Sequence, residues 1–83
     1  MTAITKDINL GRCETQWEQR EAFERQCRLL PDGTIGVAWL EGFLWLRDNR
    51  GNEQSFRGAA VRGCDASDSF VQHLANEFFT ALA

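Results

Sequence analysis

The sequence has few of the residues that build metal, redox or nucleophilic sites. It contains one histidine, His73, and three cysteines, Cys13, Cys27 and Cys64, with no Cys-x-x-Cys pair among them. An odd number of widely spaced cysteines does not form a complete disulfide framework, and free cysteine is among the residue types most often buried. The sequence therefore predicts three structural thiols, no metal site and no cofactor.

The one nucleophilic pair that can be drawn is Cys64 with His73, with Asp65 or Asp68 orienting the imidazole. The same four residues are the candidate metal ligands, but no standard ligand spacing relates them. The seven glycines stand at predicted turns and strand ends, so no glycine pattern that cradles phosphate is present. We therefore predict no catalytic residue and a protein that is not an enzyme.

Long apolar runs and a strong excess of one charge are also missing. No stretch approaches the roughly 18 apolar residues of a membrane span, and the opening "MTAITKDINLGRC" has no apolar run behind a basic patch, so we expect no signal peptide. The net charge is −3, with nine Lys and Arg against twelve Asp and Glu, which disfavours general binding to nucleic acid or anionic membranes. At 83 residues we expect one cytoplasmic domain over 1–83.

The single proline, Pro31, lies in "LLPDGT", a turn that separates a charged N-terminal third from an apolar hairpin. Residues 13–30 are rich in Glu, Gln and Arg, which favour a helix. A strand over 23–29 is the alternative, and Arg25 would spoil its apolar face. The first ten residues can add an edge strand. The predicted helix gathers its apolar side chains in one sector: Cys13, Trp17, Phe23, Cys27 and Leu30.

Residues 33–61 predict a three-stranded antiparallel meander. "GTIGVAWL" alternates in the manner of a strand, and Glu41-Gly42 suits a two-residue loop because glycine accepts positive φ. This loop sets Trp39 opposite Leu44 and, on the other face, sets Ala38 opposite Trp45. Side chains directly opposite share a face, so the two tryptophans are expected to point to opposite sides of the sheet.

The second turn decides the register of the third strand. A two-residue Arg50-Gly51 loop would place Asp48 opposite Glu53, and like charges directly opposed are destabilising. A three-residue loop, 49–51, puts glycine where a left-handed residue is wanted. We therefore expect the second register, whose pairs are Arg47 with Glu53, Trp45 with Ser55, and Leu44 with Phe56.

Residues 66–82 predict a second helix, capped by Asp65 or Ser67, with Asp68 complementing the positive end of the helix. Its apolar residues spread over about half of the helical wheel, which fits a helix laid across one face of the sheet. We expect that face to be the one with Trp39, which would then be buried with Leu44 and Phe56. The predicted fold class is α+β, a meander with two helices packed on it.

The other face of the sheet leaves two arrangements open. The N-terminal helix can cover it and give an α/β/α sandwich, or that helix can pack beside the C-terminal one and leave the face to a partner or a second copy. Charges in the row Arg47, Glu53 and Arg57 are costly to bury without partners, and Trp and Arg are enriched at binding hot spots. We therefore predict a partner-binding surface formed by Phe43, Trp45, Arg47 and Arg57.

These patterns favour a small acidic protein-binding module, an inhibitor or an adaptor, with homodimerisation as one form of association. Small inhibitors from phages and mobile elements, anti-CRISPR proteins among them, are similar in size and charge; this is an analogy and rests on no motif. The alternative is a nucleic-acid-binding domain that uses the arginines of the hairpin region. These are Arg47, Arg50, Arg57 and Arg62.

Overall fold

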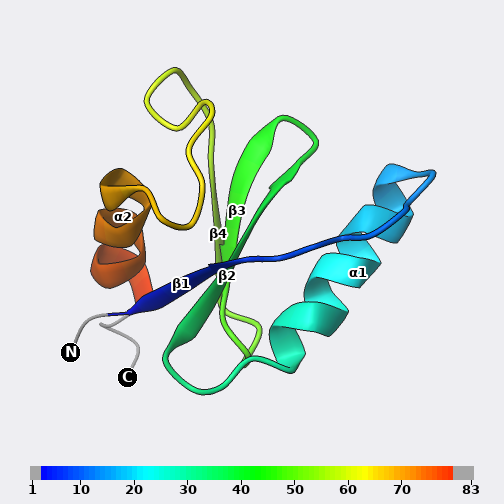
Figure 1. Cartoon of the computed structure of the whole chain (residues 1–83), viewed down its shortest axis with the longest axis horizontal. Helices are drawn as coiled ribbons and strands as arrows, with labels where there is room; N and C mark the ends of the chain where they lie inside the picture. The colour runs from blue at the N-terminus through cyan, green and yellow to red at the C-terminus, as the bar shows by residue number, and fades with distance from the viewer. Residues whose placement is uncertain (1–2, 80–83) are drawn as a thin grey trace.

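Two helices flank a four-stranded mixed sheet in the computed structural model of the chain, which describes residues 3–79 (Figure 1). The fold is therefore α+β, as the sequence predicts. The N-terminal helix, α1, and the C-terminal helix, α2, lie on opposite sides of the sheet (Figure 1). The elements follow in the order β1 (Ile4–Asp7), α1 (Gln16–Arg28), β2 (Thr34–Leu40), β3 (Phe43–Arg47), β4 (Glu53–Phe56) and α2 (Ser69–Phe79).

The predicted antiparallel meander makes up three of the four strands. The sheet order is β1-β2-β3-β4, with β2, β3 and β4 antiparallel and β1 parallel to β2. The edge strand predicted within the first ten residues is thus β1, and its parallel pairing makes the sheet mixed. The meander is shorter than expected, because β4 ends at Phe56 and Gly58 then adopts a φ of 128°, outside the region that strands use.

Both predicted registers are confirmed. Trp39 pairs with Leu44 and Ala38 with Trp45 across the first turn, and Arg47 pairs with Glu53 across the second. Register follows from turn geometry and from the alternation of side chains between faces. The local sequence carried both kinds of information here.

The first turn holds a non-glycine residue in the left-handed region. Glu41 has a φ of 56° and Gly42 a φ of 82°, the signs that a two-residue type I′ hairpin loop requires. Glycine adopts such a φ freely, whereas the left-handed conformation costs another L-residue about 1–2 kcal/mol. Glu41 is therefore a strained position in an otherwise regular hairpin.

Replacing Glu41 with Asn is expected to stabilise the protein by about 0.5–1 kcal/mol, because Asn-Gly is the preferred type I′ pair and Asn tolerates positive φ. Urea unfolding followed by tryptophan fluorescence would measure the change. Glu41→Gln is the matched control, since it removes the same charge and keeps the strain. Equal stabilisation by both variants would attribute the effect to charge and refute the backbone explanation.

The main core lies between the sheet and α2. Its members come from β2, β3, α2, the segment 57–68 and Ala3 before β1, and include Val37, Leu44, Leu46, Val71 and Phe79. Apolar side chains at helical spacing on α2 and at alternate positions on the strands meet on this face. Phe56 joins it from β4 and contacts Phe78, with the ring centroids 5.5 Å apart.

Trp39 is not in this core, and that expectation was wrong. It shares the face of Val37 and Leu44 but is 39% exposed. The reason is that α2 begins only at Ser69, so the segment 57–68, and not a helix, lies over the Trp39 end of the sheet. The predicted caps shift accordingly: Asp68 Oδ1 accepts from the Phe70 amide at 3.2 Å, while residues 80–82 of the predicted helix lie outside the described part of the chain.

The opposite face of the sheet is covered by α1. Of the two predicted arrangements, the structure therefore has the α/β/α sandwich. Phe23, Cys27 and Leu30 pack against Ala38 and Leu40, with Trp45 partly buried beside them. The helix is shorter than predicted because Thr15 caps it, its side chain accepting from the Glu18 amide at 3.1 Å. Trp17, one of the residues expected in the apolar sector, is 72% exposed.

Candidate functional site

The four residues predicted to bind a partner fall into two groups. Trp45 and Arg47 lie beneath α1, while Phe43 and Arg57 lie at the other end of β3 and β4, near the β2–β3 turn. The two groups adjoin at Phe43 and Trp45, whose ring centroids are 6.3 Å apart with the rings tilted by 56°. They differ in what surrounds them, since α1 packs on Trp45 while Phe43 lines a cleft at the end of the hairpin.

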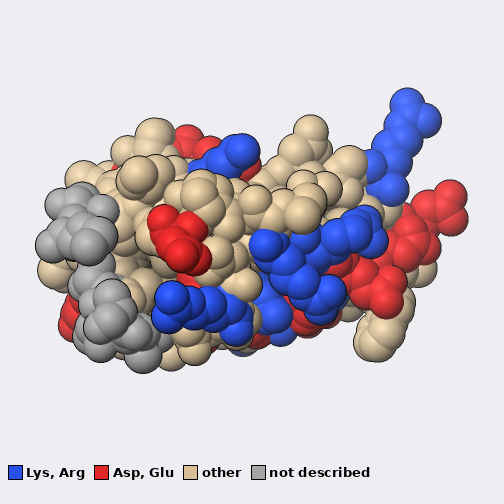
Figure 2. All heavy atoms as spheres, turned by 90° about the horizontal axis from the view of Figure 1, so that it is seen from below, with Lys and Arg blue, Asp and Glu red and all other residues tan. Residues whose placement is uncertain are grey.

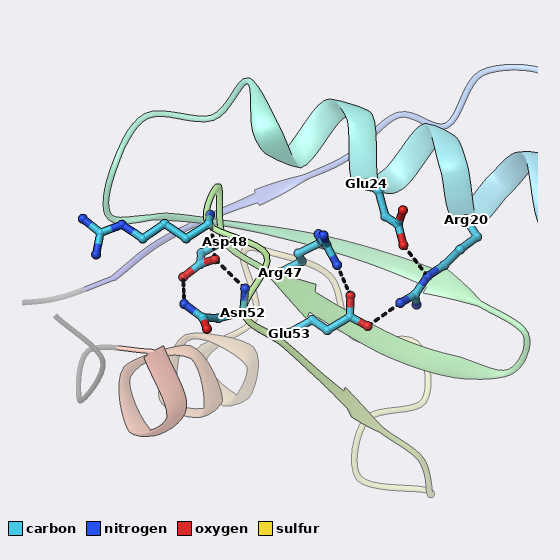
Figure 3. Close-up of polar contacts among 7 residues, drawn as sticks. Arg20, Glu24, Arg47, Asp48, Asn52 and Glu53 are labelled. Carbon is cyan, nitrogen blue, oxygen red and sulfur yellow. Dashed lines mark hydrogen bonds and ion pairs between the residues drawn. The ribbon is translucent and has the colours of Figure 1, made fainter.

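The first group is tied to α1 by a charged network. Glu53 accepts from both Arg20 of α1 and Arg47 of β3, and Arg20 also pairs with Glu24 at 3.1 Å (Figure 3). Partial burial lowers the pKa of the Arg20 guanidinium, but the carboxylates of Glu53 and Glu24 raise it by more, so its net pKa is raised. The arginine of the helix is thus fixed above the sheet.

Trp45 completes this contact. The Arg20 guanidinium lies 4.3 Å from the centroid of the Trp45 ring, a distance at which cation–π attraction operates. The Trp45 indole N–H donates to the Leu40 carbonyl at 3.1 Å. Both polar and apolar parts of the indole are therefore used within the protein.

The expectation of an open second face is corrected by these contacts. It relied on the cost of burying unpaired charges. Glu53 pairs with Arg47, as the register predicts, and Arg20 of the distant helix α1 adds a second ion pair with Glu53 and the contact with Trp45. The direct roles of Trp45 and Arg47 in partner binding remain predictions. Their contacts in the structure are intramolecular.

The second group lies in a cleft where the β2–β3 turn and the segment after β4 project from the same end of the sheet (Figure 1). The cleft has a volume of about 360 Å³. We call it the hairpin-end cleft. Its lining residues are Trp39, Glu41, Gly42, Phe43, Arg57, Gly58 and Arg62.

Aromatic surface and positive charge meet in the hairpin-end cleft. The Arg57 guanidinium lies 5.6 Å from the Phe43 ring centroid, within cation–π range. Trp39 donates its indole N–H to the Cys64 carbonyl at 2.9 Å. This bond fixes the indole and uses its only donor, so what Trp39 offers a ligand is apolar ring surface.

Sequence reasoning found Phe43 and Arg57 of this cleft and missed Trp39 and Arg62 as their neighbours. Trp39 and Phe43 point to opposite faces of the sheet, and a flat meander would keep them apart. They meet at the end of the hairpin, where the segment 57–63 folds back alongside the turn. The sequence indicates Arg62 only as a candidate nucleic-acid contact, because no local pattern near it predicts that the chain returns to the hairpin.

A second cleft, of about 490 Å³, lies between residues 6–11 and α1. Among the described residues no aromatic side chain lines it, and its apolar lining is aliphatic, from residues such as Ile8, Leu10 and Leu29. Binding energy concentrates on aromatic and arginine anchors in partly desolvated pockets. The smaller hairpin-end cleft has such anchors, and it is therefore the candidate site.

Cys64 and His73 have separate partners in the structure. His73 pairs with Glu77, one turn along α2, at 3.4 Å. Partial burial, and then the carboxylates of Asp68 and Asp65, raise the pKa of the Cys64 thiol, whereas a nucleophilic cysteine needs a lowered pKa. Within residues 3–79 no group of three or more His, Cys, Asp or Glu side chains is placed to hold a metal ion.

All three cysteines are expected to react slowly with a thiol reagent such as DTNB at pH 7–8 in the folded state. Burial raises the pKa of Cys27 to about 11, so it should react only when α1 leaves the sheet, and Cys64 should react faster as the pH rises. Absorbance at 412 nm against time, with and without denaturant, measures this. Fast labelling of Cys64 that is lost in His73→Ala would overturn it and restore a nucleophilic pair.

No protein-family model, no curated protein and no solved structure matches this chain. In the part of the chain that the structure describes, neither helix is long and apolar enough to cross a membrane. The functional interpretation therefore depends on the geometry of the hairpin-end cleft.

Proposed function

We propose that the chain is a non-enzymatic protein-binding module, an inhibitor or an adaptor, and that its partner docks at the hairpin-end cleft. The observation that carries this proposal is an exposed tryptophan beside two arginines that have no acidic partner in residues 3–79. Trp and Arg dominate binding hot spots because they combine large contact area with directional polar groups. The phage or mobile-element type of inhibitor stays part of the proposal on the basis of size and charge.

Nucleic-acid binding is the second candidate, and the distribution of arginines makes it weaker. Arg47 is paired with Glu53 beneath α1, and Arg50 lies in the turn at the far end of β3 from Arg57. On the face of the molecule seen from below, basic side chains are flanked by acidic ones (Figure 2). Affinity for nucleic acid needs several cationic groups aligned on successive phosphates, and this arrangement favours a protein partner.

A capture experiment tests the proposal. The tagged chain would be recovered from a lysate of its native host with and without nuclease, and co-purifying proteins would be identified by mass spectrometry. The test variant carries Arg57→Glu and Arg62→Glu in the cleft. The matched control carries Arg25→Glu and Arg28→Glu on the exposed side of α1.

We expect a protein that is recovered regardless of nuclease, is retained by the control and is lost with the cleft variant. Loss of a single hot-spot residue costs about 2 kcal/mol or more, so the double reversal should abolish detectable capture. If the co-purifying proteins are lost when nuclease is added, the result would instead favour the nucleic-acid candidate. Light scattering of wild type and cleft variant separates self-association, because a second copy in the cleft would give a dimer that the charge reversal dissociates.

A further inference from the structure

We infer that the hairpin-end cleft recognises an acidic peptide segment, with a carboxylate held by Arg57 and Arg62 and an adjacent apolar side chain placed on Trp39. This inference rests on the proposed function and names the chemistry of the partner. It follows from the unpaired charges of the cleft, the kind of apolar surface it exposes and the position of Glu41.

The two arginines of the cleft are available to a ligand. The ion pairs of residues 3–79 involve Arg20, Arg47 and His73, and within this range no carboxylate oxygen lies within 4.0 Å of the Arg57 or Arg62 guanidinium. Guanidinium groups bind carboxylates through two parallel hydrogen bonds. The cleft is therefore locally cationic on a chain whose net charge is −3.

The apolar part of the cleft suits one or two side chains. Its volume of about 360 Å³ lies at the lower end of the range for small ligand pockets, roughly 300–1,000 Å³. Trp39 is 39% exposed and its indole N–H is already bonded to Cys64. An aliphatic or aromatic side chain can cover the Trp39 ring without depriving the indole of its hydrogen bond, so no unsatisfied donor opposes binding.

Glu41 distinguishes a peptide from a polyanion. Its carboxylate belongs to the same cleft lining as the two arginines but has no ion-pair partner in residues 3–79. A polyphosphate crossing the cleft would meet this negative charge, and like charges repel. A peptide can instead direct a carboxylate to the arginines and a backbone N–H to the Glu41 carboxylate.

Chemical-shift titration of the ¹⁵N-labelled chain would test this recognition directly. The probe is a capped peptide, acetyl-Glu-Phe-Glu-Leu-amide, and its isosteric control is acetyl-Gln-Phe-Gln-Leu-amide. We expect shifts of the Trp39 indole N–H and of the Arg57 and Arg62 Nε–H signals that saturate at millimolar peptide. Affinity should fall at least fivefold for the Gln peptide, for Arg57→Gln/Arg62→Gln and on raising the salt concentration from 20 to 300 mM.

Three results would overturn the inference. Equal binding of both peptides would show that the cleft does not require a carboxylate and would refute the inference. The protein-binding proposal would then still be tested separately by the capture experiment. Tighter binding of a short single-stranded oligonucleotide or of inorganic phosphate at the same signals would assign the cleft to phosphate groups. Absence of shifts at Trp39 with every probe would refute acidic recognition, while Arg25→Gln/Arg28→Gln should bind as wild type if the inference holds.

Discussion

Replacing Phe23 with Ala is expected to lower the free energy of unfolding by about 3–5 kcal/mol, the usual effect of deleting a large buried aromatic side chain. Phe23 is fully buried between α1 and the sheet, in a small cluster whose buried members among residues 3–79 are Phe23, Cys27, Leu30, Ala38 and Leu40. The total stability of a chain this size is about 4–12 kcal/mol. The substitution should therefore remove at least about a quarter of the total stability, and all of it if the stability lies at the lower end of that range.

Trp17→Ala is the matched control on the same helix. Trp17 is 72% exposed, and substitutions at such positions usually change stability by no more than about 0.5 kcal/mol. Guanidinium unfolding followed by circular dichroism compares the two without relying on tryptophan fluorescence. If Phe23→Ala and Trp17→Ala had similar effects, α1 would not be packed on the sheet as described.

Gly36→Ala should have the second largest effect, about 3 kcal/mol of destabilisation, at the upper end of what overpacking costs. A Cβ atom at this position would lie 2.5 Å from Cys27 Sγ and 2.9 Å from Ile8 Cγ1. Both contacts are shorter than van der Waals separation, so Ile8 must shift, and either the Cys27 side chain or α1 itself must move away from β2. The backbone conformation is not the cause, because Gly36 lies within a regular strand and does not have a positive φ.

Combining Gly36→Ala with Cys27→Ala tests that explanation. The smaller side chain at 27 makes room for the added methyl group, so the double variant should be more stable than the two single effects predict by about 1 kcal/mol or more, the coupling expected for residues in contact. Additive effects would show that the methyl group and the sulfur do not compete for space. Urea unfolding of the four proteins provides the cycle.

The local sequence determined the pairing of the hairpin strands. Alternation placed Trp39 and Trp45 on opposite faces, and the glycines at 42 and 51 fixed the loop lengths, with φ values of 82° and 91° in the structure. These features act between residues close in sequence, through steric limits on φ and the two-residue period of a strand. Asp48 adds a local contact of the same kind, since its Oδ1 accepts from the backbone amides of Arg50 and Asn52 at 2.9 Å.

What covers each face was decided only by the tertiary structure. The three tryptophans are equally hydrophobic in the sequence, yet their surroundings differ. Trp17 is exposed, Trp39 is partly exposed beside a cleft, and Trp45 is packed under α1. The difference depends on partners distant along the chain: the Cys64 carbonyl for Trp39, and Arg20 for Trp45. Periodicity reports which side a residue faces, whereas burial and charge pairing depend on which segment returns to that side, and long-range packing alone sets this.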